Sequence, residues 1–360
     1  MAYLVLSNGM FFKGERIGAN ISSIGELVFT TGMVGYLETL TDPSYAGQIV
    51  VQTFPLIGNY GVIEEDFEGE CAVRGYVVRE LCDNPSNFRS KYKLDKFLKD
   101  KGICGISGVD TREITRILRE EGVMNAALCD ELPNEAMMSE LRGYCVKDVV
   151  RQVSVKEKHI YPPNTETCEK YNVALIDYGA KANIIRSLTA RGCSVTVFPC
   201  TATAEEILSY DPDGIMLSNG PGDPAENVFC IEQIKKLIGK KPIFGICLGH
   251  QLTALAMGGK TMKLKYGHRG GNQPVKECGG KRTYITSQNH GYAVVSDSIS
   301  EVGRVSFVNA NDGSCEGVDY DGKMCFTVQF HPEACAGPMD TEFLFDRFIE
   351  MMRKNDGRRY

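Results

Sequence analysis

The residues after position 170 alternate between short apolar runs and segments with helical periodicity, and this alternation is the strongest constraint on the fold. The apolar, strand-like runs cover residues 173–177, 194–198, 214–217, 242–246, 283–286 and 325–330. Helical segments occupy residues 182–190, 205–209, 231–238, 248–257 and 341–353. Such alternation predicts an α/β domain with an open, mainly parallel sheet and helices on both faces. Ligands of such sheets bind beyond the carboxyl ends of the strands.

The first part of the chain has a different pattern, which predicts a smaller domain of mixed α/β type. Strand-like runs at residues 3–6, 26–30, 48–53 and 71–78 are separated by Gly, Asn and Pro turns. One helix is expected at 94–98, and a second opens at Asp110, where Glu113 would complete a capping box. We predict domains at 1–150 and 171–360. Residues 151–170 lose the apolar periodicity, so we interpret them as an exposed linker.

The composition excludes several classes of function. The 360 residues are 43% hydrophobic and 24% charged, which is typical of a soluble globular protein with a core in each half. The net charge of −6 argues against a nucleic-acid or anionic membrane partner. There is no apolar run of the roughly 18 residues that a transmembrane helix needs, and the start lacks the basic region of a signal peptide. We therefore expect a cytoplasmic protein.

One of the 14 cysteines stands out. Their number indicates a reducing cytosol, and no Cys-x-x-Cys spacing suggests a zinc or redox site. Cys247 lies at a strand-to-helix junction within Gly245-Ile246-Cys247-Leu248-Gly249, the layout of a nucleophile elbow with Cys in place of Ser. The helix N-terminus there would lower a thiol pKa. A packed cysteine is the alternative interpretation, and it is the one we adopt for the other thirteen.

The candidate base is one of five histidines. His331 ends a strand before Pro332, and Glu333 points the same way two residues later, so the two side chains can form a hydrogen bond. Such a bond fixes the tautomer of the ring, as the third member of a triad does. A surface turn is the alternative. We expect His250 to point away from Cys247, and His268 to lie in a glycine-rich loop.

Two glycine-rich segments are similar to nucleotide-binding loops. In residues 220–225 two prolines remove N–H donors and Asp223 adds negative charge, so a dinucleotide site is rejected. The glycines there could still donate to a smaller oxyanion. The segment 259–261 lacks the earlier glycine of a phosphate loop, because position 254 is Ala254. Without an ATP loop we expect hydrolysis alone, with no metal and no cofactor in this chain.

Two sets of motifs resemble a known family. Residues 245–251, together with Phe330-His331-Pro332-Glu333, resemble the class I (triad) glutamine amidotransferases. Motifs that resemble the small subunit of carbamoyl-phosphate synthase cover nearly the whole chain, and they lie at 32–36, 41–45, 57–61, 109–112, 218–224 and 288–291. The motifs in the first 150 residues distinguish this subunit from other amidotransferases.

The resemblance implies a role for each site residue. Cys247 would attack the carboxamide of glutamine, His331 would transfer the protons, and Glu333 would orient His331. A γ-glutamyl thioester would form and then be hydrolysed. The N–H groups of Gly220 and Leu248 would hold the oxyanion. The residues that match positions contacting the substrate glutamine are Ser44, Gly220, Gly222, Leu248, Gln251, Asn289, Gly291 and Tyr292. From the sequence pattern alone Ser44 is a turn residue, and Tyr292 stands where Phe is common.

The resemblance also implies a partner. Ammonia would pass to a large synthetase subunit that uses ATP, Mg and bicarbonate to make carbamoyl phosphate for pyrimidine and arginine biosynthesis. The two chains would form a heterodimer. A first alternative is a glutaminase that serves a purine, tryptophan-pathway or CTP synthetase instead. A second alternative is a non-catalytic regulatory subunit, which would be expected to lack Cys247 or His331, and both are present.

Overall fold

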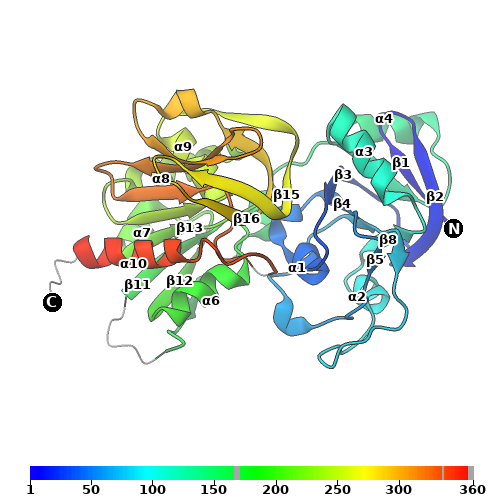
Figure 1. Cartoon of the computed structure of the whole chain (residues 1–360), viewed down its shortest axis with the longest axis horizontal. Helices are drawn as coiled ribbons and strands as arrows, with labels where there is room; N and C mark the ends of the chain where they lie inside the picture. Colours follow the sequence, from blue (N-terminus) through cyan, green and yellow to red (C-terminus); the bar gives the residue numbers. More distant parts are fainter. Residues whose placement is uncertain (166–170, 335, 356–360) are drawn as a thin grey trace. The chain divides into compact units, whose positions relative to one another are not determined.

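The computed structural model describes residues 1–165, 171–334 and 336–355, which form two compact units, Met1–Lys147 and Asp148–Tyr360 (Figure 1). The second unit begins inside the predicted first domain, with helix α5 (Val149–Val153). Strand β10 (His159–Tyr161) lies in the predicted linker and pairs antiparallel with β12 (Cys193–Pro199). Its three side chains are exposed, which explains why its sequence indicates a linker. Residues 166–170 of that segment lie outside the described residues.

The first unit is built around a closed barrel with strand order β1-β2-β8-β6-β4-β3-β9. The strands are β1 (Ala2–Leu6), β2 (Phe11–Gly18), β3 (Ser23–Thr30), β4 (Gln48–Gln52), β6 (Gly75–Val77), β8 (Cys104–Ser107) and β9 (Met124–Cys129). A separate pair is formed by β5 (Leu56–Ile57) and β7 (Glu80–Leu81). The sequence pattern did not predict β2, β8 or β9, and so it missed the closure of the barrel.

The helices of the first unit include both predicted ones. They are α1 (Tyr36–Thr41), α2 (Leu94–Asp100), α3 (Thr111–Glu121) and α4 (Glu135–Gly143). The Asp110 side chain caps α3 by accepting a 3.0 Å hydrogen bond from the N–H of Glu113. The Glu113 carboxylate instead pairs with Arg116 at 2.6 Å, since both lie on the exposed face of the helix. The predicted capping box is therefore only half formed.

The second unit contains one mixed sheet with strand order β10-β12-β11-β13-β14-β19-β18-β16-β15-β17. The parallel part joins β12 to β11 (Tyr171–Asp177), β13 (Gly214–Leu217), β14 (Ile243–Ile246) and β19 (Cys325–Val328). The antiparallel part contains β15 (Thr261–Glu277), β16 (Thr283–Val294), β17 (Arg304–Asn309) and β18 (Cys315–Tyr320). Five of the six predicted strands belong to the parallel part, but residues 283–286 lie in the antiparallel strand β16, and the antiparallel part is larger than the sequence pattern predicts.

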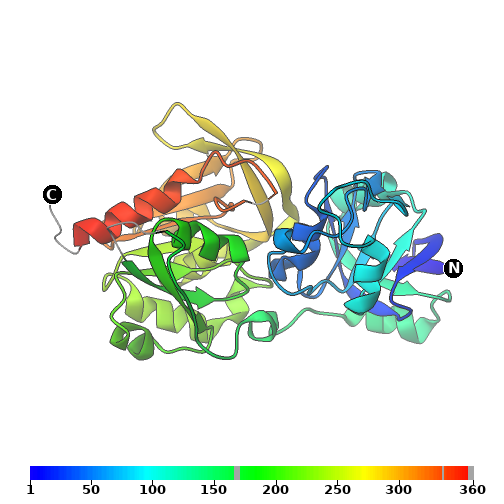
Figure 2. The same ribbon diagram turned by 90° about the horizontal axis from the view of Figure 1, so that it is seen from below.

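Helices cover both faces of the parallel strands, as the α/β pattern requires (Figures 1 and 2). Val173 and Leu175 of β11 pack with α6 (Ala182–Ala190) and α10 (Phe343–Asn355). Ala174 and Ile176 point the other way and pack with α7 (Ala204–Ser209), α8 (Val228–Leu237) and α9 (Leu248–Ala256). Burial on both faces explains why these strands are continuous apolar runs. In the described part of the chain, no helix combines the length and apolar character needed to cross a membrane.

Candidate active site

Cys247 lies in a sharp turn between the end of β14 and the start of α9, as the sequence predicts. Its φ of 52° and ψ of −101° are rare for a residue with a side chain. Two backbone bonds hold this conformation: the N–H of Cys247 donates to Val328 O at 2.8 Å, and its carbonyl accepts from the N–H of Gln251 at 3.1 Å. Strained backbone of this kind is common at catalytic nucleophiles. The thiol is buried and lies 3.8 Å from the carbonyl oxygen of Asn289.

The two glycines of the elbow are required by close backbone contacts. A Cβ on Gly245 would lie 3.0 Å from the backbone of Gly249, and a Cβ on Gly249 would lie 2.5 Å from Leu217 O. The N–H of Gly249 also donates to Ser218 O at 3.0 Å. Helix α9 therefore passes directly against the ends of β13 and β14, which places Cys247 at the carboxyl edge of the sheet.

His331 and Glu333 form the hydrogen bond that the sequence predicts. Nδ1 of His331 lies 2.7 Å from Oε1 of Glu333, and both side chains are fully buried. Burial alone would raise the pKa of Glu333, but the charge of His331, its hydrogen bond and the charge of Lys181 lower it below the ordinary value. Nε2 of His331 is buried and has no hydrogen-bond partner among the residues that the structure describes. The ring can therefore exchange a proton at Nε2 while Glu333 holds Nδ1.

The sheet brings the nucleophile and the base to one edge. Strands β14 and β19 are parallel neighbours in which Ile246 pairs with Val328. Cys247 directly follows β14, and His331 lies shortly beyond the end of β19. The N–H of His331 donates to Ser287 O at 2.9 Å, which ties this segment to β16. A cysteine, a histidine and a carboxylate thus lie at the same edge of the sheet, where ligands of parallel sheets bind.

The two predicted oxyanion donors are neighbours. Leu248 opens α9, where the first N–H groups have no acceptor inside the helix. A Cβ on Gly220 would lie 2.3 Å from Tyr178 O and 2.8 Å from Leu248 Cδ2, so the loop after β13 packs against the start of α9. Gly222, in the same loop, has a φ of 88° that favours glycine.

The other predicted glutamine contacts lie on α9 and β16, with one exception. Nε2 of Gln251 donates to Tyr292 O at 2.8 Å and to Gln329 Oε1 at 2.9 Å, so it links α9 to β16 and to the segment before His331. Asn289 is buried on β16, and Gly291 and Tyr292 follow it there. Ser44 belongs to the first unit, in the 3₁₀ turn Pro43–Tyr45, and its contact with glutamine stays a prediction.

Two further histidines have roles in the interior of the second unit. Nδ1 of His250 lies 2.8 Å from Thr327 Oγ1, and complete burial lowers the pKa of this ring to about 3. His268 was expected in a loop, and that prediction is wrong, because it lies in β15. The glycines around it mark irregular strand pairing: the register of β15 with β16 shifts between Lys263 and His268.

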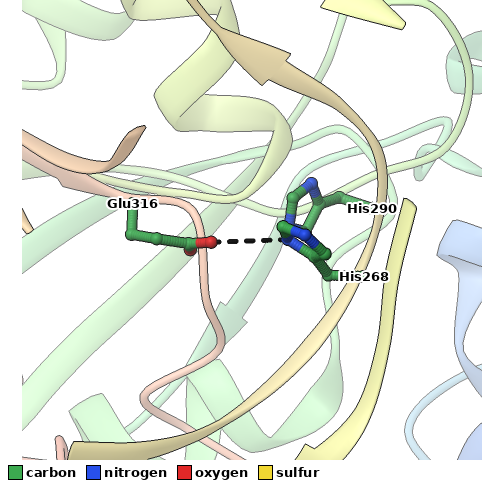
Figure 3. A group of neighbouring side chains, drawn as sticks. All are labelled: His268, His290 and Glu316. Carbon is green, nitrogen blue, oxygen red and sulfur yellow. Dashed lines mark ion pairs between the residues drawn. The ribbon is translucent and has the colours of Figure 1, made fainter. Parts of the chain in front are cut away.

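Sequence reasoning missed one buried cluster beside the site. His268, His290 and Glu316 bring their nitrogen and oxygen atoms within 4.8 Å of one another (Figure 3). This spacing could admit a metal ion, but Nδ1 of His290 lies 2.8 Å from Tyr292 O, its Nε2 lies 3.0 Å from the Gln288 side chain, and both Glu316 oxygens face protein donors. The cluster is thus a hydrogen-bonded network, and the absence of a metal stays a prediction. The signal was Glu316, a carboxylate in the buried strand β18.

Comparison with known families agrees with this geometry. Residues 174–351 match the family described as glutamine amidotransferase class-I, and residues 4–128 match the carbamoyl-phosphate synthase small chain, CPSase domain. The second unit is therefore a class I glutamine amidotransferase domain, and the predicted α/β class is confirmed.

Curated relatives extend the match to both units. Proteins named carbamoyl phosphate synthase small chain are 49% identical over 351 residues in Clostridium perfringens and 49% identical over 359 residues in Listeria monocytogenes. These alignments cover 97% and 98% of this chain and 99% and 98% of the relatives. A protein of the same name from Fusobacterium nucleatum is 50% identical over 98% of both chains. The chain belongs to the carbamoyl-phosphate synthase small chain family and is a glutamine-hydrolysing amidotransferase.

Proposed function

We propose that this chain hydrolyses L-glutamine through a γ-glutamyl thioester on Cys247 and supplies the ammonia to a carbamoyl-phosphate synthase. The observation that carries the proposal is the elbow at Cys247 next to the His331–Glu333 pair, on adjacent parallel strands. A regulatory subunit without catalytic activity would not need this arrangement of three groups.

The proposed reaction follows from the roles of the three side chains. Nε2 of His331 accepts the thiol proton, and Sγ of Cys247 attacks the carboxamide carbon of glutamine. The N–H groups of Gly220 and Leu248 hold the oxyanion, which collapses to the thioester as His331 returns its proton to the departing ammonia. His331 then takes a proton from water, the hydroxide attacks the thioester, and glutamate leaves while Cys247 regains its proton. Glu333 keeps Nδ1 protonated and the ring in place throughout.

The remaining pocket residues are proposed as contacts of the substrate. These residues are Gly222 in the loop after β13, Gln251 on α9, and Asn289, Gly291 and Tyr292 on β16. The bonds from Gln251 to Tyr292 O and Gln329 fix the relative positions of α9 and β16, and with them the space for the amino-acid part of glutamine. Ser44 is proposed to contribute from the first unit.

The destination of the ammonia is proposed from the family. The match of residues 4–128 to the small-chain CPSase domain favours a carbamoyl-phosphate synthase over other synthetases. We propose a cytoplasmic heterodimer with a large subunit that binds ATP and Mg and consumes bicarbonate. The product would enter pyrimidine and arginine biosynthesis.

Two measurements test this proposal. In the first, the chain is quenched in acid during turnover of labelled glutamine, and peptide mass spectrometry should find the γ-glutamyl group on Cys247. A Cys247→Ala variant should keep its fold by circular dichroism and lose hydrolysis; full hydrolysis by this variant would contradict the mechanism.

In the second measurement, the chain is co-purified with the large subunit from its own source. Glutamine should then support carbamoyl phosphate formation from ATP and bicarbonate. Activity with ammonia but not with glutamine would show that this chain does not serve that synthetase.

A further inference from the structure

Glu316 is a buried carboxylate whose two oxygens both have protein partners. It lies on β18 with 0% of its surface exposed. Its Oε1 accepts from Asn309 Nδ2 at 3.2 Å. The same oxygen lies 3.5 Å from His268 Nδ1 (Figure 3). Its Oε2 accepts from Gln288 Nε2 at 3.0 Å. Burying a carboxylate is costly, and such partners are what make it tolerable. A neutral residue could fill the same space in the core without this cost.

The carboxylate orients Gln288. Oε2 of Glu316 accepts a hydrogen bond from the NH₂ group of Gln288, which therefore faces Glu316. The same NH₂ group donates to Thr286 Oγ1 at 3.1 Å. The Gln288 carbonyl oxygen is then turned toward Nε2 of His290, 3.0 Å away. Glu316 thus determines which end of the Gln288 amide faces His290.

His290 connects Gln288 to the proposed glutamine site through the carbonyl oxygen of Tyr292. Its Nδ1 lies 2.8 Å from the carbonyl oxygen of Tyr292, the same oxygen that accepts from Gln251 Nε2 at 2.8 Å. The side chains of residues 288 and 290 point to the network side of β16, whereas Asn289 between them lies with its carbonyl oxygen 3.8 Å from the thiol of Cys247. Strand β16 therefore carries the network residues 288 and 290 next to Asn289 and Gly291, two of the proposed substrate contacts.

We propose that Glu316 is a positioning residue for glutamine binding. Through Gln288 and His290 it holds the Tyr292 carbonyl on which Gln251 is anchored, and so keeps β16 and α9 at the spacing that fits the substrate. The inference rests on the proposed function, because it assigns Glu316 to the same pocket. In the part of the chain that the structure describes, Glu316 forms no hydrogen bond with the thiol of Cys247 or with His331. Its loss should therefore weaken binding more than chemistry.

The test uses a chloroketone analogue of glutamine, from which Sγ of Cys247 displaces chloride to form a thioether. Purified full-length chains are inactivated over a range of analogue concentrations, and iodoacetamide labelling of Cys247 is measured in parallel. In Glu316→Gln the half-saturating analogue concentration should rise about 10- to 100-fold, the size of effect expected from a small misplacement of binding groups. The maximal inactivation rate and the iodoacetamide rate should change less than about threefold.

Two further variants separate an effect on positioning from a general loss of structure. Asp319→Asn removes a carboxylate from the same strand, where it pairs with Arg304 and Arg347, and should leave the half-saturating concentration unchanged. The double variant Glu316→Gln with Gln288→Glu exchanges the carboxylate and the amide and keeps an acceptor toward His290. It should restore the half-saturating concentration to within about threefold of the wild type.

Each other outcome overturns the inference. A half-saturating concentration in Glu316→Gln equal to that of the wild type or of Asp319→Asn would show that Glu316 does not position the site, and would leave the proposed function intact. If Glu316→Gln alone fails to fold, a folded double variant whose half-saturating concentration is still raised more than about tenfold would show the same. A wild-type chain that reacts with iodoacetamide but not with the analogue would overturn the proposed function, and this inference with it.

Discussion

The N–H of Cys247 donates a 2.8 Å hydrogen bond to the carbonyl oxygen of Val328, the last residue of the strand that leads to His331. The spacing of nucleophile and base is therefore set by the ladder between β14 and β19 and not by the two side chains alone. Strand ladders are among the most rigid parts of a fold, and a site built on them is held in its reactive geometry before the substrate arrives.

The first prediction concerns the pH dependence of glutamine hydrolysis. Nε2 of His331 must be unprotonated to accept the thiol proton, so the rate should fall at acid pH as the Cys247–His331 pair becomes fully protonated. Initial rates at saturating glutamine should be measured alongside circular dichroism, to separate this loss from unfolding. A rate that stays flat from about pH 5 to about pH 9 would contradict the assignment of the pair.

The second prediction concerns Glu333. In Glu333→Gln the new amide can donate as well as accept, so the ring is no longer held with its proton on Nδ1. We expect kcat to fall about 10²- to 10⁴-fold, with a smaller change in KM, because orientation of the base matters most in the transition state. Glu350→Gln, on the exposed face of α10, is the matched control and should retain full activity. Equal kcat values for the two variants would remove Glu333 from the triad.

The third prediction concerns the second glycine of the elbow. A methyl group at position 249 would lie 2.5 Å from Leu217 O and 2.8 Å from Leu217 Cβ, so α9 must move away from β13. We expect Gly249→Ala to lower the free energy of unfolding by about 1–3 kcal/mol and to lower kcat, since Cys247 moves with the helix. Urea unfolding and glutamine hydrolysis measure the two effects.

Gly143→Ala provides the control for that variant. No atom lies within 4 Å of a Cβ built at Gly143, at the end of α4. Alanine there should leave activity unchanged and stability equal or slightly higher. Wild-type stability and activity in Gly249→Ala would show that the elbow tolerates a wider turn than its contacts indicate.

The parts of the site that could be predicted from sequence are those with local geometry. The elbow around Cys247 is a strand, a turn and a helix that follow one another directly in the chain. The bond between His331 and Glu333 joins positions two residues apart in extended chain. In both cases the spacing alone determines which side chains face one another.

The parts that could not be predicted depend on long-range strand pairing. Strands β2, β8 and β9 become a barrel only through partners far along the chain, and β10 gains its conformation from β12. Glu316 lies on β18, while Gln288 and His290 lie on β16, and no local pattern links the two strands. The glycines around His268 indicate a loop, but they lie in a bulged strand, because the backbone of β15 pairs there with the backbone of β16.

The last prediction uses His250 to separate stability from catalysis. Burial lowers the pKa of this ring from 6.5 to about 3 in the folded chain. Below about pH 6.5 the unfolded chain therefore binds a proton that the folded chain does not, so stability falls as the pH is lowered toward the folded pKa. The loss is about 1.4 kcal/mol per pH unit, or about 2 kcal/mol between pH 6.5 and pH 5. Because His250→Gln lacks this titration, the stability advantage of the wild type over the variant should be about 2 kcal/mol smaller at pH 5 than at pH 7.

Urea unfolding followed by circular dichroism at the two pH values checks this. His159→Gln, on the exposed strand β10, is the control and should change the urea midpoint equally at both. An advantage of the wild type over His250→Gln that is the same at pH 5 and pH 7 would mean that the ring is already accessible to protons in the folded chain, and that the contact between α9 and Thr327 opens far more readily than a 2.8 Å buried hydrogen bond implies.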